Sequence, residues 1–97
     1  MHTKSIRKLI DLCYYPNPYL QRQACRVINS IAAYPTGVYW DILKDAGAIE
    51  ALQHIIDNAP KDRVRLFFAS SAIIRILIYI RMDLLLFSES VARVVDD

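Results

Sequence analysis

The chain has 97 residues, enough for one small domain. Hydrophobic residues make up 55% of it, above the roughly 45–50% typical of soluble domains, and the mean hydropathy is +0.21. Twelve Lys and Arg against ten Asp and Glu leave a net charge of +2, too small and too dispersed for a nucleic-acid surface. So small a chain cannot bury this surplus, which predicts a surface covered by a partner, a membrane or a second copy.

Residue types that carry catalysis or bind metals are sparse. Cys13 and Cys25, with His2 and His54, lack the spacing of a zinc site. Two cysteines are typical of buried free thiols in a reducing compartment rather than of a disulfide framework. No glycine-rich phosphate loop, His-Glu-x-x-His motif or nucleophile elbow occurs. We therefore expect no catalytic residue, no metal and no cofactor, in an intracellular chain that is cytoplasmic or mitochondrial.

The first third of the chain has the signals of two helices. Thr3 or Ser5 can cap a helix that ends before Pro16. Asn17 can cap a second helix, with Pro18 at its first position, where the missing N–H group costs nothing. Both segments place hydrophobic residues at the spacing of one helix face.

The rest of the chain continues in the same way, without strand-like alternation. Further helices are expected over 38–46, 48–58 and 61–81, followed by two shorter pieces, 83–87 and 88–95. Gly47 is predicted to end the short helix as a left-handed cap, and Pro60 opens the long hydrophobic one. The sequence therefore predicts an all-helical fold.

One group of hydrophobic residues recurs after a fixed interval. Ile6, Leu9 and Leu12 return 43 positions later as Ile49, Leu52 and Ile55. A period of about 20–50 residues is typical of solenoid repeats. Each unit buries its hydrophobic face by stacking on the next unit, so we expect a short α-solenoid.

Two segments resemble armadillo repeats. Residues 17–32 (NPYLQRQACRVINSIA) are similar to the third helix of that family, and residues 45–56 (DAGAIEALQHII) to the join between its first and second helices. The resemblance implies one right-handed α-solenoid domain over 1–97, with a partial repeat 3–34, a full repeat 38–81 and a partial repeat 82–97. HEAT-like helix pairs are the close alternative, and the short helix before Gly47 favours armadillo.

The resemblance also identifies a candidate site. In peptide-binding armadillo proteins each third helix carries a tryptophan and, four residues on, an asparagine. These positions fall on Arg26 and Ser30, and in the next repeat on Ser71 and Arg75, so the signature for extended peptides is missing. Arg22 shares the helix face of Arg26 and Ser30. The five residues form a candidate basic patch on the concave face for an acidic segment, headgroups or a neighbouring subunit, or else a solvated face.

A second candidate surface lies near the C-terminal end of the sequence. It comprises Leu84, Leu85, Leu86 and Phe87, where a solenoid needs a polar cap. The preceding hydrophobic run, 66–80, is shorter than the roughly 20 residues that span a bilayer and contains Arg75. It therefore fits a buried helix better than a membrane span.

These features predict a non-catalytic scaffold, an accessory subunit of a larger complex that could be organellar. Its expected partners are other protein subunits and not nucleic acid, and any membrane contact would come through a membrane-bound complex. One alternative is a free-standing adaptor that binds an acidic peptide on the concave face. Another is a membrane-associated subunit that uses residues 66–87.

Overall fold

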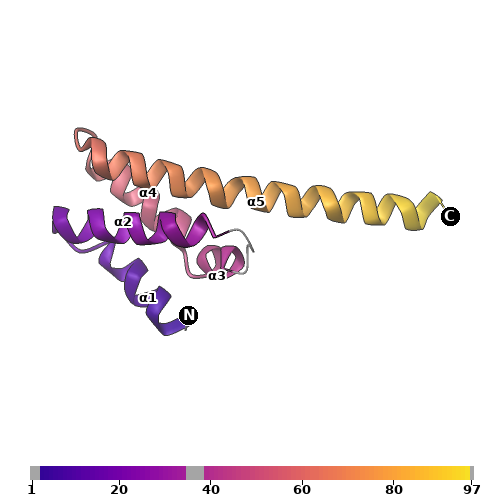
Figure 1. The fold of residues 1–97 in the computed structure, drawn as a ribbon, viewed down its shortest axis with the longest axis horizontal. Coiled ribbons are helices and arrows are strands. Elements are labelled where there is room, and N and C mark those ends of the chain that lie inside the picture. The colour runs from indigo at the N-terminus through magenta and orange to yellow at the C-terminus, as the bar shows by residue number, and fades with distance from the viewer. Residues whose placement is uncertain (1–2, 35–38, 97) are drawn as a thin grey trace.

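The computed structural model describes the backbone of residues 3–34 and 39–96 and, within them, the side chains of 4–34, 39–81 and 92–93. Every regular element in these ranges is a helix, which confirms the all-helical prediction (Figure 1). The helices are α1 (Thr3–Leu12), α2 (Pro18–Ala32), α3 (Trp40–Asp45), α4 (Ala48–Asn58) and α5 (Arg63–Asp96). None of them, over the described residues, is both long and hydrophobic enough to cross a bilayer.

The C-terminal third differs from the prediction. α5 runs unbroken for 34 residues, where the sequence predicts a helix over 61–81 and two shorter pieces. No proline or glycine occurs between its ends, so nothing interrupts the backbone hydrogen bonds. In Figure 1 the C-terminal part of α5 extends beyond the other helices. Leu84, Leu85, Leu86 and Phe87 belong to this helix, and their side chains lie outside the described residues.

α2 and α5 begin with the same cap. Oδ1 of Asn17 accepts hydrogen bonds from the backbone N–H groups two and three residues on, at 3.0 and 3.2 Å. Asp62, 45 positions later, does the same at 3.1 Å for each bond. Each side chain satisfies N–H groups that have no partner inside the helix. The cap predicted at Asn17 is confirmed, and the fold repeats it at Asp62.

Helix starts recur after 45 residues in the structure, and a spacing of 43 does not superpose the buried helix faces. α1 and α4 begin 45 residues apart, as do α2 and α5. At this spacing Ile6 matches Ala51 and Ile10 matches Ile55, and all four are buried. At a spacing of 43, the fully buried Ile6 would match the half-buried Ile49. A shift of two residues turns a helix by about 200°, so the shorter period superposes different helix faces.

The join between α3 and α4 confirms the left-handed cap predicted at Gly47. Its φ is 86°, a conformation that glycine adopts without the clash of a Cβ atom. The N–H group of Gly47 donates to the Lys44 carbonyl at 3.1 Å, and its carbonyl accepts from the Ala51 N–H group at 3.1 Å. Gly47 therefore provides hydrogen-bond partners for a carbonyl group at the end of α3 and for an N–H group at the start of α4.

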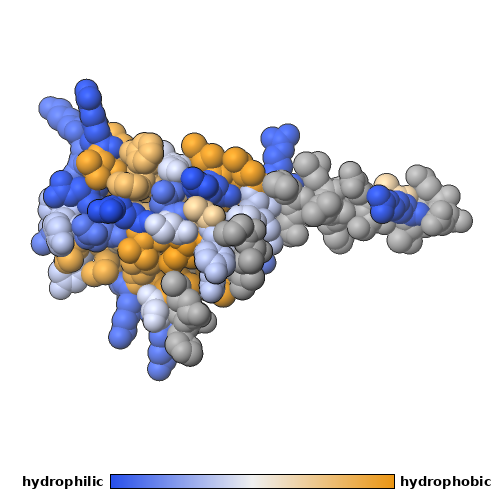
Figure 2. All heavy atoms as spheres, in the orientation of Figure 1, coloured by the Kyte–Doolittle hydropathy of each residue, from blue (hydrophilic) through white to orange (hydrophobic). Residues whose placement is uncertain are grey.

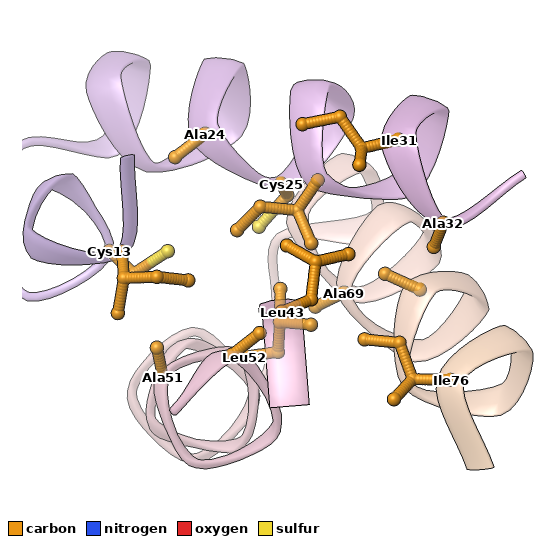
Figure 3. Packing of buried hydrophobic residues seen from close by; sticks show 14 of the residues in the cluster. Cys13, Ala24, Cys25, Ile31, Ala32, Leu43, Ala51, Leu52, Ala69 and Ile76 are labelled. Atoms are coloured by element: carbon orange, nitrogen blue, oxygen red, sulfur yellow. The ribbon is translucent and has the colours of Figure 1, made fainter. Parts of the chain in front are cut away.

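The hydrophobic core lies between α1, α2, α4 and α5, and α3 contributes Leu43 to it. α2 and α5 form the largest helix–helix contact, and both run from left to right in Figure 1. Figure 3 shows side chains from α2, α4 and α5 converging on the same space. The large side chains buried most completely are Ile6, Ile28, Leu43, Leu52, Ile55 and Ile76.

Trp40 attaches α3 to this core. Its Nε1 donates a hydrogen bond to the carbonyl of Ala32 at the end of α2. Its ring lies against Tyr79 of α5, with 4.0 Å between the ring centroids. One side chain therefore connects the start of α3 to the end of α2 and to the middle of α5.

Candidate functional site

The outer side of α5 exposes large hydrophobic side chains. Phe67 is 65% exposed, Ile74 55% and Ile78 54%. Their spacing places them on one side of the helix, opposite the buried Ala69 and Ile76. Figure 2 shows hydrophobic atoms at the surface along α5. These three residues line a groove of about 670 Å³ together with Arg63, Leu66, Ser70, Ser71 and Arg75. We call it the α5 groove.

A second groove, the α2 groove, follows the outer side of α2. It has a volume of about 460 Å³ and is lined by Gln23, Arg26, Val27, Ser30, Ile31, Tyr34 and Tyr39. Val27 is 43% exposed and Tyr34 52%. The rings of Tyr34 and Tyr39 meet edge to face, with 5.7 Å between their centroids, which carries the groove from α2 toward the start of α3.

The five residues of the predicted basic patch lie on different surfaces. Ser71 and Arg75 line the α5 groove, whereas Arg26 and Ser30 line the α2 groove. Arg22 lines neither of these grooves, and it lies beside the loop between α4 and α5. The resemblance therefore identified residues near both grooves, and the structure does not gather all five into one site.

Two of these arginines point toward α5. The guanidinium carbon of Arg26 lies 5.7 Å from the centroid of the Phe68 ring, a cation–π distance. A guanidinium nitrogen of Arg22 lies 3.9 Å from the carboxylate of Asp62. Both contacts join α2 to the start of α5, and the carboxylate of Asp62 offsets the charge of Arg22.

A polar network that the sequence reasoning missed joins the starts of α2 and α5. Buried Gln21 donates through Nε2 to the carbonyls of Cys13 (3.1 Å) and Tyr15 (2.8 Å). Its Oε1 accepts from the guanidinium of Arg65 at 2.7 Å. Arg65 also donates to the carboxylate of Asp62 at 2.7 Å. Because its members satisfy one another, we assign the network to packing and not to binding.

Two signals in the sequence could have indicated this network. Gln21 is spaced three and four residues from the buried Ala24 and Cys25, so a polar side chain stands on a hydrophobic helix face. Asp62 precedes Arg65 by three residues at a helix start, the spacing of a capping carboxylate and a paired cation. Neither signal identifies Arg65 as the hydrogen-bond partner of Gln21, because the two residues lie 44 positions apart in the chain.

The carboxylate of Asp62 is stabilised in its charged form. Hydrogen bonds from the backbone N–H group and then the guanidinium of Arg65 lower its pKa below the ordinary 3.8, and the nearby charges of Arg65 and Arg22 lower it further. A carboxyl group whose pKa is lower in the folded chain contributes stability above its unfolded pKa. That contribution is lost as the pH falls through the folded pKa.

We therefore expect the free energy of unfolding to decrease as the pH falls below 3.8. Asp62→Asn keeps an oxygen for the cap but has no charge to lose, so its acid decline should be shallower. Urea unfolding followed by circular dichroism between about pH 2 and pH 6 measures both profiles. Parallel profiles for the two proteins would contradict the assignment, and Asp57→Asn on the exposed side of α4 is the matched control.

Cys13 and Cys25 are free and buried in the core, as predicted (Figure 3). Burial raises the pKa of Cys13 from 9.0 to about 12 and that of Cys25 to about 11. Because the thiolate is the nucleophile and the metal ligand, both groups stay protonated and unreactive at neutral pH. They act in this fold as small hydrophobic side chains.

Side chains that could carry other chemistry are dispersed. Over the part of the chain that the structure describes, no three His, Cys, Asp or Glu side chains come together as a metal ion would require. His54 packs against Tyr14, with 4.8 Å between the ring centroids. The two grooves are therefore the candidate binding surfaces. No family model matches the chain, and searches of curated proteins and of solved structures found no match either.

Proposed function

We propose that the chain is a non-catalytic interaction module, an accessory subunit that other protein subunits cover in a larger assembly. The observation that carries this proposal is the α5 groove, in which Phe67, Ile74 and Ile78 are each more than half exposed. Burying a side chain of this size fully is worth about 1.5–3 kcal/mol. Large hydrophobic side chains gathered on one surface are typical of a site of protein contact.

We further infer that the helices form a short armadillo-like solenoid. The order of a short α3, a longer α4 and a long α5 supports this, as does the recurrence of α1 and α2 as α4 and α5 after 45 residues. The parallel, adjacent placement of α2 and α5 is in keeping with stacked third helices. The short α3 favours armadillo over HEAT-like pairs. α5 continues past residue 82, where the sequence predicts a repeat boundary.

Arg75 favours a second candidate function, an adaptor for an acidic peptide. It is exposed in the α5 groove, and it forms no hydrogen bond or ion pair with the described residues. A cation beside hydrophobic side chains can bind a carboxylate while the groove binds an apolar residue of the same peptide. This function predicts salt-sensitive binding that Arg75→Glu abolishes.

The proposed function predicts an effect on assembly size. In extracts of the source cells we expect the native chain to elute with an assembly much larger than 11.2 kDa. The double variant Phe67→Ser/Ile74→Ser should no longer elute with that assembly, because it lacks the hydrophobic contact. Its buried core is unchanged. Size-exclusion chromatography of fresh extracts, with detection of the chain by antibody, measures the shift.

Tyr15→Ser/Tyr19→Ser is the matched control, because both tyrosines are exposed and lie outside the two grooves. It should leave the assembly size unchanged. Elution of the native chain at monomer size would contradict the proposal. Recovery of the assembly only in detergent would support the membrane-associated alternative. If Arg75→Glu and high salt each dissociate the chain from the assembly, while the double variant still elutes with it, the adaptor function would be supported.

A further inference from the structure

α2 and α5 are equivalent helices, yet they are buried on different sides. At the 45-residue spacing, Ala24 matches Ala69 and Ile31 matches Ile76, and all four are buried. A stripe on α2 is also buried and consists of Gln21, Cys25, Ile28 and Ala32. The matching stripe on α5, which we call the open stripe of α5, consists of Leu66, Ser70, Ile73 and Leu77. Its members are half-buried or exposed.

α5 packs against the start of the buried stripe of α2, and Trp40 of α3 contacts its far end at Ala32. Arg65 of α5 donates a hydrogen bond to Gln21 in that stripe, and α5 makes its largest contact with α2. At the far end of the stripe, Ala32 is 1% exposed, whereas its counterpart Leu77 is 49% exposed. α5 therefore exposes the helix side that is buried on its counterpart, α2.

α2 has an open stripe as well. It consists of the positions that match the side of α5 facing α2. α5 faces α2 with Arg65 and Phe68, and its buried Ala72 continues the same helix side. The positions on α2 that match this side are Leu20, Gln23 and Val27; Tyr34, which matches Tyr79, lies two residues beyond the end of α2. Val27 and Tyr34 are exposed, and Leu20 and Gln23 are half-buried. We call these four residues the open stripe of α2.

We infer that a second copy of this chain stacks head to tail on the first. The open stripe of its α2 packs on the open stripe of α5, as α5 packs on α2 within one chain. The inference rests on the proposed function, because it names the subunit that covers this side of α5. Six of the eight stripe residues are hydrophobic and the other two, Ser70 and Gln23, are uncharged. The stripes themselves therefore bury no unpaired charge, and Arg26, Arg63 and Arg75 line the grooves beside them.

A symmetric pair of α5 helices is less favourable on grounds of charge. Residues 63–81 contain four arginines and no acidic residue. An antiparallel pair centred on Ala72 would bring Arg63 of each copy toward Arg81 of the other, and like charges repel. Head-to-tail stacking avoids this register. It also leaves one open stripe at each end, so the assembly grows beyond a dimer unless it closes into a ring.

Light scattering of the purified chain over a range of concentrations tests the inference. We expect the mass of the native chain to rise with concentration from 11.2 kDa past that of a dimer. Val27→Lys damages one stripe and Leu77→Lys the other, and each contact needs both stripes. Each variant alone should therefore raise the apparent dissociation constant at least about tenfold. An equimolar mixture of the two should form a heterodimer and stop there, since one intact contact remains.

Two variants control for the added charge and the lost side chain. Tyr19→Lys on α2 and Val64→Lys on α5 change exposed hydrophobic residues outside the open stripes. Both should associate like the native chain, and thermal unfolding by circular dichroism should confirm that all four variants are folded. A native chain that stays monomeric at every concentration would overturn the inference. So would a Val27→Lys chain that still dimerises, which would indicate symmetric α5 pairing.

The two proposals fail in different ways. If the purified chain stays monomeric but elutes in a large assembly from cell extracts, the second copy is excluded and another subunit covers α5. If the chain elutes as a monomer from extracts as well, the proposed function fails with it.

Discussion

Leu52→Ala is expected to lower the free energy of unfolding by about 2–5 kcal/mol, the largest single effect that we predict. Leu52 is fully buried in α4, and Figure 3 shows it where α2, α4 and α5 converge. Truncation removes hydrophobic contacts and leaves a cavity that three packed helices cannot close. Stable domains have only about 5–15 kcal/mol in total, so this one change should unfold much of so small a chain on mild heating.

Urea unfolding followed by circular dichroism, at a concentration where the chain is monomeric, measures this loss. Leu77→Ala is the matched control, because it makes the same chemical change at a half-exposed position of α5. Its expected cost is below about 1 kcal/mol. Equal losses for the two variants would mean that the core does not lie between α2, α4 and α5.

Gln21→Ala is expected to lower the free energy of unfolding by about 1–3 kcal/mol. The change leaves the buried carbonyl of Cys13 and the carbonyl of Tyr15 without their donor, and Arg65 without one acceptor. Buried polar groups that lose a partner carry the full cost of their lost hydration. Gln53→Ala is the matched control, because Gln53 is exposed on α4 and its side chain donates a hydrogen bond to the exposed Asp57. We expect it to change stability by about 0.5 kcal/mol or less.

A double-mutant cycle separates the network from its parts. Arg65→Ala removes the charged partner of Gln21 and of Asp62. Because the residues share hydrogen bonds, the double variant should lose less stability than the two single losses added together, with a coupling of about 0.5–3 kcal/mol. Strict additivity would show that Gln21 and Arg65 act independently, contrary to the network described above.

Signals that act through neighbouring backbone groups predicted the helix boundaries within a few residues. Asn17 and Gly47 act on N–H and carbonyl groups at most four positions away, so their effects can be predicted without a tertiary structure. Breaks near residues 82 and 88 were predicted without such a residue, and α5 runs through both. The predicted spacing of 43 differs by two from the 45 residues between the helix starts, because hydrophobic residues three and four apart can be superposed in more than one register.

The candidate site could be predicted only in part. Ser71 and Arg75 were placed on the surface where the α5 groove lies. Arg22 was predicted to be available to a partner, and it lies beside Asp62, which is 40 residues away in the chain. The exposure of Phe67 and Ile74 contradicts the prediction of a buried helix over 66–80, since α5 is hydrophobic on most sides and its periodicity does not say which side remains open.

The sequence by itself determined that the chain is helical, where its first four helices lie and that it has more hydrophobic residues than a small core can bury. These properties follow from composition and from interactions within a few residues. Only the tertiary structure decided the 45-residue register, the Gln21–Arg65 contact and the two stripes that stay open. The reason is physical: whether a hydrophobic helix face is buried depends on which distant helix packs on it, and local periodicity carries no information about that neighbour.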